Sequence, residues 1–417
     1  MKYDVIVVGG GAAGVYAAIQ MVVANPKLQV AIFVRGNNVL GKVKVSGGGR
    51  CNVTHAEFDA LELTSNYPRG EKELLGPFHS HATGDVMGFF EERGVSLKIE
   101  EDGRVFPVSN SSQSIIDCFL SETKRLGIKV LRNYQVKDFR PSEEIKGGWQ
   151  VTTKNKHYET RKLLIATGSN SKIWGHLERL GHHIVPPVPS LFTFLIQDDR
   201  IDKISGISTA ATVEVLPKKM YDSKVSITLK SKTKELPVLD AEGPVLITHW
   251  GLSGPAILRL SALGALWLNE IDYNFSIKVN WLPEYNQASL ERLFQTIKEV
   301  DGKKTILKTK AVELPRRLWT SLVQASGITA GTRWADATKE QMKALAVQLT
   351  AGIFKVEGKS TFKEEFVTAG GVDLKEINFR TFGSKKLSNL HFAGEVINVD
   401  AITGGFNFQN AWTGAYI

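Results

Sequence analysis

Residues that can support chemistry gather first near the N-terminus of this 417-residue chain, where Gly9, Gly11 and Gly14 fit the pattern G-x-G-x-x-G. In that pattern the first glycine makes a tight turn and the second lets the backbone approach a pyrophosphate. The third lets a helix pack close to a strand. The N–H groups of Ala12 and Ala13, at the start of the predicted helix, then point at the phosphates. The pattern predicts a dinucleotide site.

A second glycine-rich stretch combines backbone donors with positive charge. The residues from Gly41 to Asn52 read GKVKVSGGGRCN. We interpret the stretch as a loop whose N–H groups and three cations suit phosphates or an anionic flavin; the alternative is a flexible loop without a ligand. The candidate cofactor ligands here are Lys42, Ser46, Gly47, Gly48, Gly49, Arg50, Cys51 and Asn52.

Three residues are candidates for a catalytic role. Arg50 would stabilise negative charge near a flavin ring or orient an anionic substrate; the alternatives are a phosphate ligand and a structural ion pair. Cys51, beside Arg50, is either a thiol with a lowered pKa or, as we favour, a small buried residue. His249 precedes Gly-Leu-Ser-Gly-Pro, which we expect to open a helix, so it is either an acid/base group or a hydrogen-bonded turn residue. The histidines and cysteines show no spacing typical of a metal site.

The C-terminal segment favours FAD over a nicotinamide cofactor. A predicted strand, Asn389–Ala393, leads to Gly394 and Glu395, and an acid at that position can bind ribityl hydroxyls. A glycine pair then opens a last helix and brings N–H groups to the flavin pyrophosphate or to the N1/C2=O edge of the ring. A nicotinamide domain would not need this distant pair. The candidate ligands around the pair are Thr403, Gly404, Gly405, Phe406 and Asn407.

Two predicted strands must position the first glycine turn. Tyr3–Val8 is a continuous apolar run, as expected of a strand buried on both faces of a parallel sheet. The second strand, Gln29–Val34, would ordinarily end on an acid that binds a ribose hydroxyl. Here Val34 is followed by Arg35, which would suit a 2′-phosphate. The first glycine motif alone therefore does not choose between FAD and NADP.

The middle of the chain predicts further strands and an insertion. A β-meander over 128–161 includes the candidate Val136, and a buried strand over 163–166 ends in Ala166, Thr167 and Gly168. A close-approach loop over 368–372 holds the candidate Gly371. We expect a Rossmann-like α/β FAD-binding domain from 1–190 and 368–417. It is interrupted by a β-rich part (191–283 and 351–367) and a helical part (284–350).

Composition limits the remaining alternatives. The chain is 42% hydrophobic and 23% charged, as in ordinary globular proteins, and no apolar run is long enough to span a membrane. A strand beginning at residue 3 leaves no space for a signal peptide, and two cysteines without CxxC spacing imply neither a disulfide framework nor zinc. We expect a cytoplasmic protein. The net charge of +9 would suit nucleic acid, but we favour a basic surface without that role.

Taken together, these motifs resemble those of the BaiN/YhiN-like bacterial flavoproteins, often labelled aminoacetone oxidase family FAD-binding enzymes or NAD(P)/FAD-dependent oxidoreductases. The resemblance runs the length of the chain and adds 103–107 and 248–255 to the stretches above. It implies non-covalent FAD in a domain of the two-dinucleotide-binding type, interrupted by a β-barrel-like and helical insert. Such sequences typically carry Glu at the position of Val34.

The sequence predicts an oxidoreductase in which a flavin exchanges hydride with a small organic substrate, at the junction of the FAD domain and the insert. NAD(P)H is a candidate electron donor. The alternatives are a flavoprotein that modifies RNA and a non-catalytic flavin-binding redox protein. The sequence does not indicate the oligomeric state.

Overall fold

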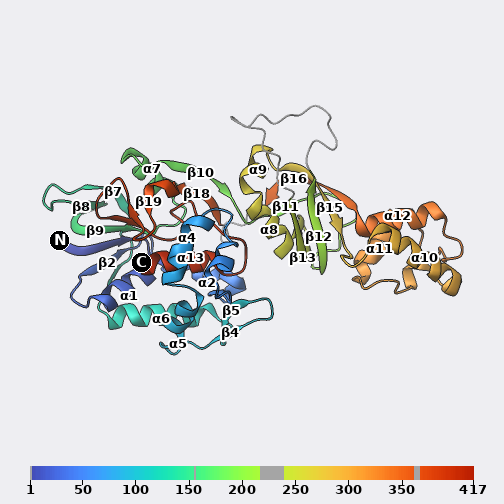
Figure 1. Cartoon of the computed structure of the whole chain (residues 1–417), viewed down its shortest axis with the longest axis horizontal. Coiled ribbons are helices and arrows are strands. Elements are labelled where there is room, and N and C mark those ends of the chain that lie inside the picture. Colours follow the sequence, from blue (N-terminus) through green and yellow to red (C-terminus); the bar gives the residue numbers. More distant parts are fainter. Residues whose placement is uncertain (1, 155, 217–238, 361–366) are drawn as a thin grey trace. The chain divides into compact units, whose positions relative to one another are not determined.

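The computed structural model describes residues 2–154, 156–216, 239–360 and 367–417 (Figure 1). The chain divides into two compact units, Met1–Ser190 with Phe362–Ile417, and Leu191–Thr361. Both ends of the chain therefore build the first unit. The sequence also contains a lysine-rich stretch at 218–234 and, within it, a short β-like run at 225–229, and both lie outside the described residues.

A mixed sheet with a parallel central part forms the centre of the first unit. Its main path runs β19-β20-β21-β9-β1-β2-β6, and β7 and β8 attach beside β9. The neighbours β21, β9, β1, β2 and β6 are all parallel. The residues of β1 from Val5 to Val8 are all buried, which explains its continuous apolar run. The strands are β1 (Lys2–Val8), β2 (Val30–Phe33), β6 (Lys129–Leu131), β7 (Val136–Pro141), β8 (Trp149–Thr153), β9 (His157–Ile165), β19 (Ile377–Asn378), β20 (Gly383–Ser384) and β21 (Leu390–Phe392).

The chain reverses its direction of travel across this sheet at β1. From β1 it crosses to β2 and β6 on one side, and it later returns to β9 and β21 on the other. Ligands of open α/β sheets bind outside the carboxyl ends of the strands at such a switch point. In the register, Ile165 is the partner of both Val8 and Phe392. The turns that follow β1, β9 and β21 therefore leave the sheet side by side.

The meander differs from its prediction at one place. The two strands expected at 157–161 and 163–166 are a single strand, β9. Its first half pairs antiparallel with β8, while β1 pairs parallel with it from Glu159 onward. The strand stays continuous because it has a hydrogen-bonded neighbour on either side.

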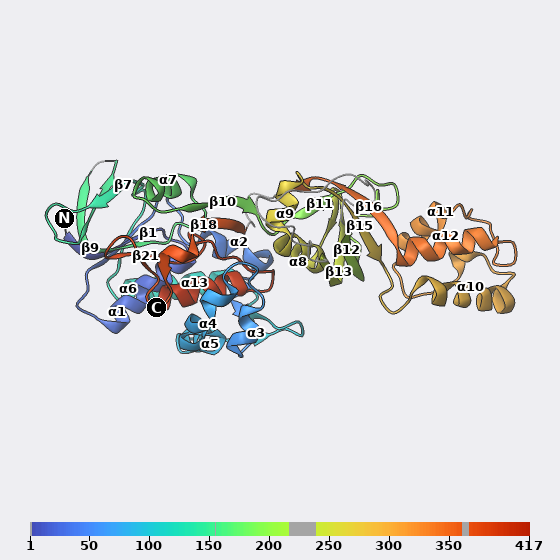
Figure 2. The ribbon, with the colours of Figure 1, turned by 45° about the horizontal axis from the view of Figure 1, so that its top comes forward.

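Helices of both chain ends pack together over the sheet (Figure 2). Tyr16 of α1 packs against Trp412 of α13, with ring centroids 5.3 Å apart, in one core that also holds Phe119 of α6. Ser111 caps α6 and accepts a hydrogen bond from the Gln113 N–H. The helices are α1 (Ala12–Ala24), α2 (Gly41–Gly49), α3 (Ala60–Thr64), α4 (Glu71–Ser80), α5 (Thr83–Glu91), α6 (Ser112–Arg125), α7 (Ser171–Arg179) and α13 (Phe406–Tyr416), with the short η3 (Leu374–Glu376). Smaller sheets join β3 (Thr54–His55), β4 (Leu97–Ile99) and β5 (Arg104–Pro107), and β10 (Ile184–Pro189) with β18 (Thr368–Val372).

The second unit combines an antiparallel sheet with helices. Among its described residues the strand order is β16-β15-β12-β13-β14-β11-β17. The strands at the two ends of this order, β16 and β17, are separated in the chain only by Gly358, so the sheet curls until its edges meet. One hydrophobic core includes both sheet residues such as Ile277 and helix residues such as Leu322. The elements are β11 (Thr193–Leu195), β12 (Ser208–Leu216), β13 (Leu239–Thr248), β14 (Gly251–Ser253), α8 (Pro255–Leu263), α9 (Ala265–Glu270), β15 (Asn274–Asn280), α10 (Gln287–Asp301), η2 (Ile306–Lys308), α11 (Arg316–Ala325), α12 (Lys339–Thr350), β16 (Gly352–Glu357) and β17 (Lys359–Ser360).

Within the part of the chain that the structure describes, no helix combines the length and the hydrophobicity needed to cross a membrane.

Candidate cofactor site

The glycine turn after β1 leaves space in front of the helix α1. Gly9 has φ +122°, and a Cβ there would lie 2.2 Å from the Ala166 carbonyl oxygen; a Cβ on Gly14 would lie 2.0 Å from the Gly9 oxygen. These two glycines therefore serve the chain's own packing. Gly11 differs, since its φ of −88° suits any residue and a Cβ there would meet nothing within 4 Å. The open space lies at the start of α1, which has neither a side-chain cap nor an acidic residue in its first turn.

The end of β2 lies against the same turn. Val34 is buried, and one of its methyl groups would lie 2.6 Å from a Cβ on Gly10. The Val34 carbonyl oxygen accepts a hydrogen bond from the Tyr134 N–H, which brings the start of β7 at Val136 to this edge. Arg35 is exposed. The position at which a ribose-binding acid is expected is thus close to the glycine turn and apolar.

The stretch predicted as a loop at 41–52 is partly helical, so that prediction is wrong for its first half. Residues from Gly41 form the helix α2, with Val43 buried, until Ser46 turns to an extended conformation and Gly47 and Gly48 become left-handed. The apolar side of this turn of helix packs into the core, which a loop-like composition did not reveal.

Glu395, in the turn after β21, lies close to residues of two other parts of the chain. Its carboxylate forms an ion pair with Lys42 of α2, and it lies 3.6 Å from the position of a Cβ on Gly168, in the turn after β9. Its neighbour Gly394 faces α1, where an added Cβ would lie 3.1 Å from the Ala13 methyl group. The structure therefore brings together predicted ligands that lie more than 350 positions apart in the chain.

The start of α13 lies against the residues that follow α2. Gly405, with φ +102°, is the N-cap residue of α13 and makes no side-chain cap hydrogen bond. A Cβ on Gly405 would lie 2.5 Å from the backbone of Thr54 and 2.9 Å from Asn52 Oδ1. That Oδ1 is buried, and it has no hydrogen-bond partner among the described residues. The start of α13 thus lacks a side-chain cap, and the buried amide oxygen beside it lacks a hydrogen-bond partner among the described residues.

His55 lies beside this glycine pair, although it is not among the predicted ligands. Its ring stacks on Phe406 at 4.5 Å, and Nδ1 lies 3.1 Å from the Gly404 carbonyl oxygen. Because a carbonyl oxygen only accepts, Nδ1 is the donor in this hydrogen bond. No spacing in the sequence points to His55, since its partners come from the other end of the chain.

The loop between β21 and α13 is fixed by buried polar contacts that the sequence did not indicate. Asp400 is fully buried and forms an ion pair with Arg69, and Ser190 donates a hydrogen bond to it. The Asn407 amide donates to the Ala401 carbonyl oxygen and accepts from its N–H, both at 3.0 Å. Asn407 thus shapes the loop that carries Thr403 and the glycine pair.

The two catalytic candidates of the second glycine-rich stretch are Arg50 and Cys51. The Arg50 guanidinium is 2.6 Å from Glu100 and lies 3.9 Å above the Phe106 ring, so it forms an ion pair within the protein, and its role near a flavin or phosphate stays a prediction. Burial raises the pKa of Cys51 to about 12, and the hypothesis of a lowered-pKa thiol is wrong. The thiol stays protonated near neutral pH.

The predicted loop at 368–372 is the strand β18, which is a second correction. A Cβ on Gly371 would lie 2.6 Å from the Val396 carbonyl oxygen, and one on Gly370 would lie 2.7 Å from Pro187. The close approach that the glycines permit is therefore to the protein's own backbone. The pairing of β18 with β10 was not visible in the sequence because it joins residues almost 190 positions apart.

His249 lies in the second unit, in the turn between β13 and β14. Its Nε2 is 3.3 Å from the Ser205 hydroxyl, and both line a pocket of about 610 Å³ together with Asp198, Asp199 and Asp202. No group of three or more acidic, histidine or cysteine side chains in the described residues is arranged to hold a metal ion. The acid/base role of His249 stays a prediction.

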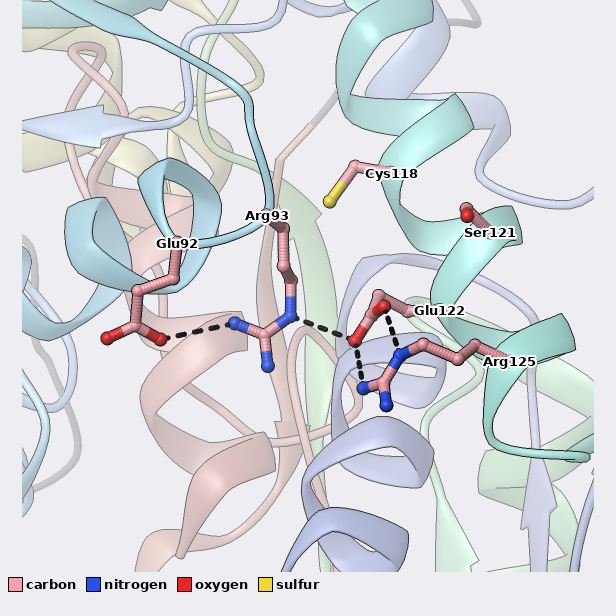
Figure 3. Close-up of a pocket in the computed structure, with 6 residues that line it drawn as sticks. All are labelled: Glu92, Arg93, Cys118, Ser121, Glu122 and Arg125. Atoms are coloured by element: carbon pink, nitrogen blue, oxygen red, sulfur yellow. Dashed lines mark hydrogen bonds and ion pairs between the residues drawn. The ribbon is translucent and has the colours of Figure 1, made fainter.

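A pocket of about 450 Å³ in the first unit contains none of the predicted ligands (Figure 3). Glu122 lies between Arg93 and Arg125 and forms ion pairs with both. Burial raises the pKa of Cys118 to about 11. Because α6 leads into β6, this pocket lies toward the amino edge of the sheet, away from the glycine turns.

The residues at the carboxyl edge of the sheet fit FAD. The open space at Gly11 is where a pyrophosphate would meet the N-terminus of α1. The uncapped α13, and Asn52 Oδ1, which has no partner among the described residues, would supply a donor and an acceptor to such a cofactor. One ligand can meet both because the glycine turns of the two chain ends border one edge.

This fold and site define a flavin-dependent reductase with a Rossmann-type fold. The chain belongs to the HI0933-like family, whose Rossmann-domain model matches residues 3–417. It is 29% identical to a ribosomal RNA dihydrouridine synthase of Haemophilus influenzae, over 99% of this chain and 96% of that protein. It is 24% identical to a 3-dehydro-bile acid delta(4,6)-reductase of Clostridium scindens, over 99% of this chain and 97% of that protein.

A second ribosomal RNA dihydrouridine synthase, from Escherichia coli, is 26% identical over 100% of this chain and 96% of that protein. Among solved structures, the fold is similar to that of 3-ketosteroid-delta4-(5alpha)-dehydrogenase from Rhodococcus jostii RHA1. The TM-score is 0.50 at 12% identity, over 100% of this chain and 95% of that one.

Proposed function

We propose that this protein binds FAD and reduces uridine in ribosomal RNA to dihydrouridine. The observation that carries the proposal is the similarity, over essentially the whole chain, to ribosomal RNA dihydrouridine synthases of two bacteria. The net charge of +9 is in keeping with an RNA substrate. These findings support the RNA-modifying alternative better than our first expectation of a small organic substrate, and they favour a nucleic-acid partner that the charge alone did not.

The reaction is the reduction of a carbon–carbon double bond conjugated with a carbonyl group. In uridine the C5=C6 bond is conjugated with the C4 carbonyl, so C6 accepts a hydride and C5 a proton. A bound flavin in its reduced form would supply the hydride, and a reductant such as NAD(P)H would then have to reduce the flavin again. The chain's task is to hold flavin and base in register, to exclude water and to deliver the proton.

The described residues divide the binding of FAD between two helix ends. The backbone at Gly11 and the first N–H groups of α1 would hold the pyrophosphate. Glu395 would accept hydrogen bonds from ribityl hydroxyls, with Lys42 fixing its carboxylate. The N–H groups at Gly405 and Phe406 would face the electron-rich edge of the ring at the positive end of α13. His55, fixed by its hydrogen bond to Gly404, is the ionisable side chain next to that turn that can hold a proton.

A small substrate is the second candidate. The bile acid reductase relative is similar over the same length of chain, and a 3-dehydro-delta(4,6) steroid also carries a double bond conjugated with a ketone. The same hydride chemistry would serve both substrates. The two substrates differ in the rest of the molecule, outside the conjugated double bond and carbonyl group, that the protein must bind.

The test is direct. The purified protein is expected to be yellow, to be bleached by dithionite, and to convert uridine to dihydrouridine in ribosomal RNA under reducing conditions, read as a mass gain of two hydrogen atoms in the digested nucleosides. Gly11→Val, which should lack flavin, is the matched control. Reduction of a steroid dienone with no change in RNA would overturn the RNA assignment and favour the second candidate. A colourless protein unable to take up FAD would contradict both.

A further inference from the structure

The chain between α10 and α11 is unusually basic. Residues 303–317, which we call the cationic connection, contain Lys303, Lys304, Lys308, Lys310, Arg316 and Arg317 and a single acidic residue, Glu313. All six cationic side chains are exposed. The connection is described throughout, and Figure 2 shows the helices α10, α11 and α12 that it accompanies.

Folding does not account for this charge. Lys304 pairs with Asp301 and Lys310 with Glu313, but Lys303, Lys308 and Arg316 have no acidic group within ion-pair distance among the described residues. Arg316 and Arg317 stand in the first turn of α11, which has no acidic residue and no side-chain cap. Cations there oppose the positive end of the helix dipole. The basic residues are thus a cost to the isolated fold that a bound polyanion would remove.

The cationic connection joins two defined places in the second unit. At its start, the backbone N–H of Trp334 donates a hydrogen bond to the Lys304 carbonyl oxygen at 3.0 Å. This contact brings the exposed Arg333 next to the connection. At its end, the Arg317 guanidinium donates to the Ser205 carbonyl oxygen at 3.3 Å. Ser205 lines the pocket that also contains His249. The positive charge therefore leads to a pocket rather than ending on a plain surface.

An exposed tryptophan stands next in sequence to residues that line this pocket. Trp250 stands between the lining residues His249 and Gly251, and it is 56% exposed. The carboxylates of Asp199 and Asp202 would repel a phosphate but can accept hydrogen bonds from N–H groups of a base. An exposed indole stacks on unpaired bases of any sequence.

We propose that the cationic connection binds the phosphate backbone of the RNA substrate and that Trp250 stacks an unpaired base beside it. The inference rests on the proposed function for the identity of the polyanion. Phosphates lie along the cations from Lys303 to Arg317, and the base lies at the pocket, which Lys203 lines together with the aspartates. The surface thus recognises an unpaired base by stacking and binds the RNA backbone by electrostatic attraction.

The experiment compares two triple variants of the full-length protein in RNA binding at several salt concentrations. Lys303→Gln/Lys308→Gln/Arg316→Gln removes three unpaired cations from the connection. The matched control, Lys27→Gln/Lys124→Gln/Lys129→Gln, removes three exposed cations of the first unit that also have no ion pair among the described residues. For the connection variant, the slope of log affinity against log salt should fall by about 2 to 3, at about 0.7–0.9 per cation, and the control slope should stay near that of the wild type.

Trp250→Ala tests the stacking half. It should weaken RNA binding by about 5- to 100-fold without changing the salt slope. Equal slopes for the connection variant and the wild type, in a protein that forms dihydrouridine, would overturn the inference and leave the proposed function intact. A wild type that makes no dihydrouridine, but whose slope for RNA binding still depends on the connection, would remove the proposed function alone. Binding to anionic lipid vesicles in preference to RNA would overturn the inference as well.

Discussion

Thr54 donates a buried hydrogen bond of 2.6 Å to the side-chain oxygen of Gln409, although 355 positions separate the two residues. Gln409 in turn donates to Thr413, and Thr413 donates to the His81 carbonyl oxygen. The Trp412 indole reinforces the contact by donating to Val53. Because this network is buried and satisfied, it sets the position of α13, and with it the glycine pair, against the residues after α2.

Gly11→Val should abolish retention of FAD while leaving the fold intact. The substituted side chain would enter open space, so it collides with no protein atom and instead occupies the place of the pyrophosphate. Flavin absorbance after purification and the melting temperature of the flavin-free protein check both halves. Gly14→Val is the contrasting variant, because its Cβ would meet the Gly9 oxygen at 2.0 Å and the protein should unfold. A yellow Gly11→Val protein would refute the assignment.

Val34→Glu should tighten FAD binding and destabilise the flavin-free protein. The new carboxylate stands at the end of β2 beside the glycine turn, where it would accept hydrogen bonds from ribose hydroxyls. Without the cofactor the same group is a charge at a buried site, which is costly. Melting temperatures with and without added FAD should therefore diverge more in the variant than in the wild type. Val34→Gln, which lacks the charge, should show a smaller effect, and an unchanged FAD affinity for Val34→Glu would mean that the ribose lies elsewhere.

Arg69→Met should cost about 3–5 kcal/mol of unfolding free energy, because it leaves the carboxylate of Asp400 buried without its cation. Denaturant unfolding at neutral pH measures the loss. Adding Asp400→Leu should recover most of the stability, since a pair of apolar residues replaces a buried ion pair at little cost. If Arg69→Met were as stable as the wild type, the ion pair would not be what holds the loop before α13.

His81 should make stability depend on pH in mildly acidic solution. The residue is buried, with Nε2 2.9 Å from the Tyr16 hydroxyl, and burial lowers the pKa of His81 from 6.5 to about 4. At a pH between these two pKa values, the unfolded chain therefore binds a proton at His81 that the folded chain does not bind. Stability should fall as the pH drops from about 6.5 to about 4, by up to about 3 kcal/mol from this residue.

His81→Gln isolates this contribution, because glutamine keeps an acceptor for Tyr16 and does not titrate. Unfolding free energies measured from pH 7 to pH 4 should decline less steeply in the variant, the other ionisable groups being common to both proteins. Parallel curves for the two proteins would show that the pKa of His81 is the same in the folded and the unfolded state.

Elements whose signals are local can be predicted from the sequence alone. The apolar run before Gly9 and the spacing to Gly14 predict a strand, a phosphate-binding turn and a helix, because each depends on neighbouring residues. Local composition misled where packing decided the conformation, as in α2, where burial of Val43 favours helix in a stretch rich in glycine.

Which distant residues meet at the candidate site depends on the tertiary fold. Asn52 and Gly405, His55 and Phe406, and Lys42 and Glu395 meet because parallel strands deliver their following turns to one edge of the sheet. Strand order and long-range pairing leave no periodic trace in the sequence, so the contacts of His55, the buried Asp400 and the pairing of β18 with β10 could not be read from it. The sequence predicted candidate flavin ligands, and the topology of the sheet determines which of them lie close together.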